Sequence, residues 1–216
     1  MGLQFFVIDT ETSGLSSSYH EITEVSIIRC TDRFQLTEFI KCDYPERANL
    51  DSLKITNKTF ADLSNGSLKE DVVKKINKFI NEDGLTPAHR CFIAHNASFD
   101  MRFIHALYSK VGEQCPVNLW ACSMALTRAY AKQIGLVKPK VNLAAACDIA
   151  GIKKIAQAHA SKMDSRNTYL LWQNLVEDKK MDYLPFIKTN EHILKPKEQD
   201  QQDENEGLDP ALLDLE

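Results

Sequence analysis

Two carboxylates near the start of the chain have the residue types and the spacing that metal chemistry needs. Asp9 and Glu11 follow an apolar run, in the segment FVIDTETSGL. Residues 3–9 predict a largely buried strand, and because side chains alternate along a strand, positions 9 and 11 lie on the same side of it. Two like charges held close together are costly unless a cation lies between them. The pair therefore indicates a metal site, although a strand that simply ends in polar residues gives the same pattern.

Two later segments add acidic groups beside predicted helices. Asp100 stands in AHNASFDMRF, after a short apolar run at residues 91–94, and Asp164 stands in AQAHASKMDSRNTYLLWQNL, five residues after His159. Each of these aspartates opens a predicted helix. Because aspartate favours the first turn of a helix, capping alone explains each of them when it is taken singly.

The order of the three segments favours catalysis over capping. D-x-E-T-S-G follows the first predicted strand, H-N-x-x-F-D follows a middle strand, and H-x-x-x-x-D precedes a late helix. With these motifs the chain resembles the DnaQ-like 3′–5′ exonucleases, in the DEDDh subgroup whose third motif carries histidine. That superfamily includes the proofreading epsilon subunit of bacterial DNA polymerase III. The resemblance covers roughly residues 3–180, including NLWACSMALTRAY at 118–130 and NLAAACDIAGI at 142–152.

The resemblance implies a role for each motif residue, and the local chemistry agrees with these roles. Hard cations take carboxylate oxygens, and two ions about 4 Å apart can hold both the attacking and the leaving oxygen of a phosphodiester. The expected cofactors are therefore two Mg²⁺ or Mn²⁺ ions, bound by Asp9, Glu11, Asp100 and Asp164. His159 is the expected general base, since the unperturbed pKa of histidine is near neutral. The expected products are nucleoside 5′-monophosphates.

The same resemblance implies contacts with the terminal nucleotide of the substrate. Thr12 and Leu15 are expected to touch it, with Leu15 wedging its base. Asn96, Phe99 and Phe103 are expected to line or support the pocket.

The predicted elements form an α/β domain with a ribonuclease-H-like fold, in which helices flank a five-stranded mixed sheet. Alternation of apolar and polar residues predicts an antiparallel meander of three strands at 3–9, 22–30 and 34–41, followed by a turn-rich connection at 43–66. Ser67 and Glu70 predict a capping box for a helix that ends at about residue 81. Short strands are expected at 91–94 and 119–122, and the other helices at 100–110, 124–135, 143–150, 164–179 and, more weakly, 183–194.

Composition divides the chain into an exonuclease domain at 1–194 and an acidic tail at 195–216. The net charge is −4, but residues 198–216 carry eight acidic side chains and no basic ones. The remaining 22 acidic and 26 basic residues leave the body at about +4, which suits a surface that meets phosphates. The tail is expected to be disordered, although its Leu213-Asp214-Leu215 resembles part of the peptide by which bacterial replication proteins bind the sliding clamp.

Other features favour a cytoplasmic protein without membrane contact. No apolar stretch approaches the roughly 18 residues of a membrane span, and the start of the chain has no basic signal-peptide region. The six cysteines include no C-x-x-C pair, so reduced thiols are expected rather than a zinc site.

The expected function is 3′–5′ excision from single-stranded or frayed nucleic acid, with DNA favoured, in proofreading or repair. One alternative is an exoribonuclease that trims RNA, because these motifs do not show whether the protein contacts the 2′ position of the sugar, where DNA and RNA differ. Another is a non-catalytic module of the same fold that binds nucleic acid or a polymerase. The intact set of four carboxylates and a histidine argues against this module. A DNA polymerase or a sliding clamp, reached through the tail, is the expected protein partner.

Overall fold

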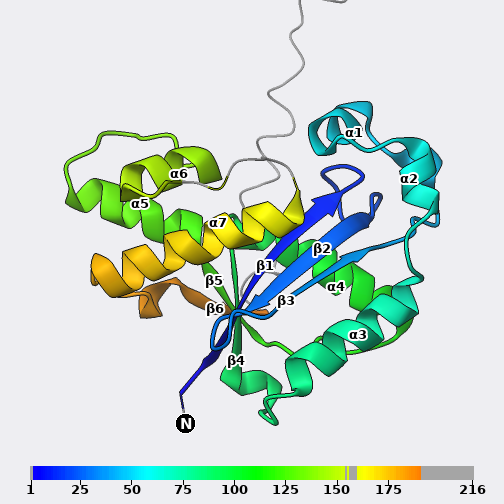
Figure 1. Ribbon diagram of the computed structural model, residues 1–216, viewed down its shortest axis with the longest axis horizontal. Helices are drawn as coiled ribbons and strands as arrows, with labels where there is room; N and C mark the ends of the chain where they lie inside the picture. Colours follow the sequence, from blue (N-terminus) through cyan, green and yellow to red (C-terminus); the bar gives the residue numbers. More distant parts are fainter. Residues whose placement is uncertain (1, 154, 156–159, 191–216) are drawn as a thin grey trace, which may run out of the picture.

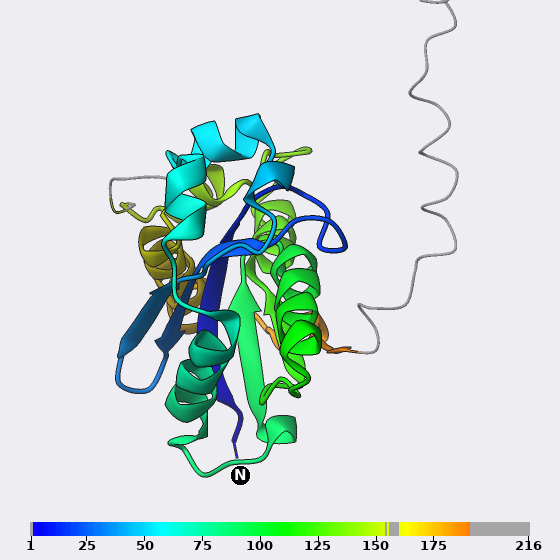
Figure 2. The ribbon, with the colours of Figure 1, turned by 90° about the vertical axis from the view of Figure 1, so that its right-hand side faces the viewer.

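A mixed β-sheet with helices packed on both faces forms the centre of the computed structural model (Figure 1 and Figure 2). The structure describes residues 2–153, 155 and 160–190. Within these residues the sheet has six strands in the order β3-β2-β1-β4-β5-β6. Their bounds are β1 Gln4–Thr12, β2 Ile22–Arg29, β3 Gln35–Phe39, β4 Arg90–Ala94, β5 Leu119–Cys122 and β6 Ile187–Thr189. The α/β class and the mixed, helix-flanked sheet are thereby confirmed.

Strand β1 lies in the middle of the sheet, and its side chains alternate between the hydrophobic cores on the two faces. It pairs antiparallel with β2 and parallel with β4. Phe6 and Ile8 enter the core on one face, whereas Val7 enters the core on the other. Because side chains alternate, Asp9 and Glu11 belong to the face of Val7, and Thr10 belongs to the opposite face.

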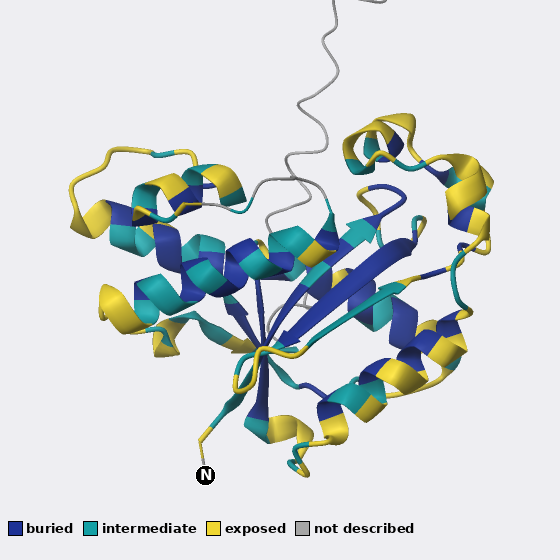
Figure 3. Ribbon diagram, in the orientation of Figure 1, coloured by how far each residue is buried: buried dark blue, intermediate teal, exposed yellow. Residues whose placement is uncertain are grey.

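Two groups of helices cover the two faces, and their inward sides are buried (Figure 3). Helices α3 (Lys69–Asn81) and α4 (Ala97–Val111) pack against Phe6 and Ile8. Helices α5 (Ser123–Gln133), α6 (Leu143–Ala150) and α7 (Ser161–Gln173) pack against Val7, and Figure 1 shows α7 lying across the sheet. Helix α7 therefore covers the face of β1 that carries Asp9 and Glu11.

The sixth strand is the main difference from the predicted sheet. Residues 187–189 were expected within a weak helix, but they form β6, which pairs antiparallel with β5. Ile187 and Thr189 are β-branched and suit a strand. The indole Nε1 of Trp120 in β5 donates a hydrogen bond of 2.8 Å to Oδ1 of Asn190. Because Asn190 directly follows β6, this bond helps to hold β6 against β5.

The connection between β3 and α3 is more ordered than the turn-rich segment that was predicted. It contains a 3-10 turn at Pro45–Arg47 and the short helices α1 (Leu50–Thr56) and α2 (Phe60–Ser64). The side chain of Asn49 caps α1, and Thr59 forms a capping box with Asp62 at α2. These local caps were not recognised because the helices are too short to show a hydrophobic period.

The capping box predicted at Ser67 and Glu70 is wrong. The residue before the first turn of α3 is Leu68, and it makes no side-chain cap. Ser67 instead bridges to the end of β3: its N–H donates to the carbonyl of Phe39 at 2.8 Å, and its carbonyl accepts from Lys41 at 2.9 Å. Pairing of its backbone with the sheet thus displaces Ser67 from the cap position.

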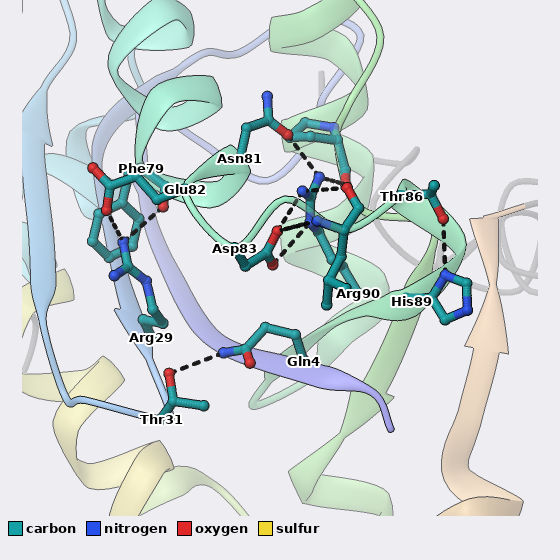
Figure 4. Close-up of polar contacts among 12 residues, drawn as sticks. Gln4, Arg29, Thr31, Phe79, Asn81, Glu82, Asp83, Thr86, His89 and Arg90 are labelled. Carbon is teal, nitrogen blue, oxygen red and sulfur yellow. Dashed lines mark hydrogen bonds and ion pairs between the residues drawn. The ribbon is translucent and has the colours of Figure 1, made fainter. Parts of the chain in front are cut away.

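A buried arginine braces the opposite end of the sheet from Asp9 and Glu11 (Figure 4). Arg90 begins β4 and pairs in register with Gln4, the first residue of β1. Its guanidinium is 1% exposed and donates to the Asp83 carboxylate, to Oδ1 of Asn81 at 2.7 Å and to the carbonyl of Pro116 at 3.1 Å. A buried charge is tolerated when all its donors are satisfied, so this cluster has a structural role.

Several predictions fall on residues outside those that the structure describes. They concern His159 and the tail at 195–216, so the division of the chain at residue 194 stays a prediction. None of the described helices is long and apolar enough to cross a membrane.

Candidate metal centre

Three predicted metal ligands come together where β1 ends beneath α7. Asp9 and Glu11 lie at the carboxyl end of β1, and Asp164 lies in the first turn of α7. One carboxylate oxygen from each of the three residues lies within 4.8 Å of the others. The alternation of β1 and the placement of α7 over that face account for this convergence.

Asp100 lies outside this group of three, but its charge reaches Asp9, and it bonds to Thr10, the residue between the two β1 carboxylates. Pairing of β1 with β4 ends at Val7, so the backbone N–H of Thr10 is left without a partner strand on that side. Oδ1 of Asp100, in the first turn of α4, accepts this N–H at 3.0 Å and the Thr10 hydroxyl at 2.8 Å. The Asp100 carboxylate is therefore fixed at the point where β4 stops.

Burial and mutual repulsion both oppose ionisation of these carboxylates. Burial, followed by the charges of Asp100, Glu11 and Asp164, raises the pKa of Asp9 well above its usual range. Burial raises the pKa of Glu11 to about 7, against the opposing charge of Lys58. Burial also raises the pKa of Asp100 to about 7, although the hydrogen bonds from Thr10 lower it. Burial in the metal-free protein thus disfavours the charged forms of Asp9, Glu11 and Asp100.

The residues fit a divalent cation such as Mg²⁺ or Mn²⁺. The ligand atoms are carboxylate oxygens, which these hard ions prefer, and they converge from two elements on one point. A cation at that point offsets the repulsion that, in addition to burial, raises the pKa values of Asp9 and Glu11.

The residues predicted to contact the terminal nucleotide differ in exposure. Leu15 is 79% exposed on the loop that follows β1, whereas Thr12 is buried and its hydroxyl donates to the carbonyl of Gly14 at 2.7 Å. Asn96 precedes α4 with a left-handed backbone (φ 77°). Phe99 and Phe103 pack together, with ring centroids 4.9 Å apart, and Phe103 is buried in the core. Because Phe103 is buried beneath Phe99, it could support the expected nucleotide pocket but not line it.

The loop that carries Leu15 is held tightly on both sides. A Cβ atom at Gly14 would lie 2.2 Å from the His20 ring, so a larger residue there requires the ring to move. The Nδ1 atom of His20 accepts the N–H of Ser16 at 3.2 Å, and the carbonyl of Ser13 accepts the N–H of Asn49 at 2.7 Å. His20 is therefore part of the loop that presents Leu15.

Sequence reasoning missed a fifth carboxylate beside the cluster. Glu24 in β2 lies directly opposite Glu11, is 4% exposed, and contributes to the raised pKa of Asp9. Its partners are the ammonium group of Lys58 at 2.8 Å and the hydroxyl of Ser161 at 2.7 Å. Glu24 and Ser26 share one side of β2 because side chains alternate along a strand, and nothing in the sequence indicates that α7 covers this polar side.

Comparisons with known proteins agree with this architecture. A family model described as Exonuclease, the RNase T family, matches residues 6–172. The chain is 29% identical over 194 residues to the DNA polymerase III PolC-type of Listeria monocytogenes and 26% identical over 177 residues to that of Staphylococcus haemolyticus. These alignments cover 84% and 82% of the chain but 12% of each relative, so the chain spans about an eighth of their length.

Solved nuclease structures share the fold at low sequence identity. Escherichia coli exonuclease I in complex with a dT13 oligonucleotide has a TM-score of 0.68 at 14% identity, covering 82% of this chain and 42% of that one. The nuclease domain of 3′hExo, a DEDDh family member bound to rAMP, has a TM-score of 0.63 at 13% identity, covering 81% and 92%. Because the family model spans most of the described fold and includes all three acidic segments, the chain belongs to the RNase T exonuclease family.

Proposed function

We propose that the chain is a divalent-metal-dependent exonuclease that removes nucleotides from the 3′ ends of single-stranded or frayed DNA. The observation that carries the proposal is the meeting of Asp9, Glu11 and Asp164 within 4.8 Å, inside an exonuclease fold. Asp100, held by Thr10, supplies a fourth carboxylate on the same strand end. Retention of this set favours catalysis over a non-catalytic binding module.

Each residue of the cluster has a part in the proposed reaction. Asp9, Glu11, Asp100 and Asp164 would hold two Mg²⁺ or Mn²⁺ ions, which supply charge stabilisation to the phosphodiester and acidify water when bound. Thr10 orients Asp100 through its amide and hydroxyl. His159, five residues before Asp164, would accept on its imidazole the proton of the attacking water. The product would be a nucleoside 5′-monophosphate.

The loop after β1 supports binding of the 3′-terminal nucleotide. Leu15 presents an exposed apolar side chain on a loop that begins one residue after Thr12, at the end of the strand that carries Asp9 and Glu11. A base can cover such a side chain and remove its apolar surface from water. Thr12, Asn96 and Phe99 would complete the contacts to this nucleotide.

DNA is the proposed substrate because the relatives found by sequence are DNA polymerases of the PolC type. Proofreading in a polymerase context is the corresponding proposed role. RNA is the alternative, since the structure of 3′hExo, which shares the fold, was solved with rAMP.

Matched oligonucleotides test the proposal. DNA and RNA of one sequence, single-stranded or annealed with a frayed 3′ end, are digested with Mg²⁺ and followed on denaturing gels. The proposal expects faster shortening of single-stranded DNA than of RNA. Faster shortening of RNA would establish the exoribonuclease alternative, and stable binding of either strand without cleavage would establish the binding module.

A further inference from the structure

The interface between α7 and the sheet is polar near the cluster, although the rest of that face is apolar. Hydrogen bonds join the first turns of α7 to β2 and β3, and we call four of them the polar seam. They are Ser161 Oγ to Glu24 Oε1 at 2.7 Å, Gln35 Nε2 to the Lys162 carbonyl at 2.9 Å, Ser165 Oγ to Ser26 Oγ at 3.1 Å and Arg166 Nε to Gln35 Oε1 at 2.7 Å. The segment of α7 that they hold carries Asp164.

Glu24 is the buried centre of the polar seam. It lies opposite Glu11 across the β1–β2 pair and shares its face of the sheet. Each of its two carboxylate oxygens already faces a donor, Ser161 at 2.7 Å and Lys58 at 2.8 Å. A carboxylate whose oxygens are engaged in this way is suited to hold protein groups in place rather than a cation.

The start of α7 depends on this contact. The residue before its first turn is Ala160, which provides no side-chain cap. The Glu24 carboxylate reaches the hydroxyl of Ser161, the first residue of the helix, and a negative charge there also favours the amino end of the helix dipole.

Lys58 makes a buried Glu24 compatible with the neighbouring carboxylates. Its side chain is 11% exposed and comes from the segment between α1 and α2, far from Glu24 in the sequence. Without the ammonium group of Lys58, the negative charge of Glu24 would be uncompensated and would lie beside the carboxylates of Asp9 and Glu11.

We propose that Glu24 is a positioning residue, which through Ser161 fixes the first turn of α7 and thereby places the Asp164 carboxylate against Asp9 and Glu11. Lys58 completes the device by balancing the charge of Glu24. This inference rests on the proposed function only in taking these three carboxylates as the ligands of the metal.

Two variants separate positioning from metal binding by Glu24. Ser161→Ala removes the hydrogen bond between Ser161 and Glu24, which we call the anchor, and it leaves every carboxylate in place. The double variant Glu24→Gln/Lys58→Met removes both charges together but keeps an acceptor oxygen for Ser161. Lys75→Met is the matched control, because it breaks a lysine–glutamate pair of the same length, 2.8 Å to Glu38, away from the seam.

Amide hydrogen exchange of residues 163–168 in EDTA and Mn²⁺ titration followed by electron paramagnetic resonance provide readouts that need no substrate. Ser161→Ala should speed exchange of these amides and weaken Mn²⁺ binding about tenfold or more, the usual cost of losing a group that orients a ligand. The double variant and Lys75→Met should stay within about threefold of the wild type, well below that cost.

Two results would overturn the inference. In the first, Ser161→Ala leaves both exchange and Mn²⁺ affinity unchanged, so the anchor has no effect on Asp164. In the second, the double variant loses Mn²⁺ as severely as Glu11→Gln while Ser161→Ala does not, so Glu24 is itself a ligand. A wild-type protein that binds Mn²⁺ with Asp164 but cleaves neither DNA nor RNA would contradict the proposed function. It would not contradict the positioning of Asp164 by Glu24 through Ser161.

Discussion

Neutralising Glu11 should make the metal-free protein more stable at alkaline pH while it damages the metal site. Burial raises the pKa of Glu11 from 4.5 to about 7. Between these values the unfolded chain releases a proton that the folded protein retains, so the folded state loses stability as the pH rises through this window and levels off above about 7. Glu11→Gln removes the titrating group and therefore removes the loss.

The pKa shift sets the size of the effect. A shift from 4.5 to about 7 corresponds to about 3 kcal/mol at 1.36 kcal/mol per unit. At pH 8 in EDTA, the unfolding free energy of Glu11→Gln should exceed that of the wild type by up to about 3 kcal/mol. At pH 5, which is only slightly above the unfolded pKa of 4.5, the difference in unfolding free energy should be about 1 kcal/mol or less.

Urea denaturation at pH 5 and pH 8, each in EDTA and in Mg²⁺, measures these differences. Glu113→Gln, at an exposed position away from the cluster, is the matched control and should show no pH-dependent gain. In Mg²⁺ the wild type should recover stability at pH 8, because the ion replaces the protons, whereas Glu11→Gln should recover less. If Glu11→Gln is no more stable than the wild type at pH 8 in EDTA, burial does not raise the pKa of Glu11 and the reasoning is refuted.

Three further predictions concern single side chains around the cluster. Thr10→Val removes the hydroxyl donor at 2.8 Å from Asp100 and should weaken Mn²⁺ binding about tenfold; an unchanged titration would contradict this role. Gly14→Ala places a Cβ atom 2.2 Å from the His20 ring, so it should displace the loop of Leu15 and raise the KM for oligonucleotides more than it lowers kcat; equal kinetics would show that the loop does not bind substrate. His159→Ala should lower kcat by about 10²–10⁴-fold and change the acidic limb of the pH–rate profile, with Mn²⁺ affinity retained. A wild-type pH profile in that variant would assign the general base elsewhere.

Local patterns were sufficient to predict the parts of the site that belong to one strand or one helix end. The alternation of β1 predicts that Asp9 and Glu11 share a face, and they do. Asp100 and Asp164 were expected in first helical turns, where both lie. The order of the motifs then indicated that these segments meet.

Contacts between distant segments were not predictable from the same patterns. Glu24 has the polar character of a solvent-facing position, and only the packing of α7 buries it against Ser161. Lys58 lies in a connection without a period, so nothing local relates it to Glu24. Strand β6 has three residues, too few to show alternation, and it forms because the edge of β5 is available to pair.

The direction and metal dependence of cleavage test the central claim most directly. Single-stranded DNA with a fluorophore on its 5′ end is digested by the wild type in Mg²⁺, by the wild type in EDTA, and by Asp9→Asn in Mg²⁺. The wild type in Mg²⁺ should give a labelled ladder that shortens one nucleotide at a time and should release 5′-monophosphates, whereas EDTA or Asp9→Asn should slow this by orders of magnitude. Early release of the label, cuts within the strand, or an undiminished rate for Asp9→Asn would contradict a metal-dependent 3′–5′ exonuclease built on these carboxylates.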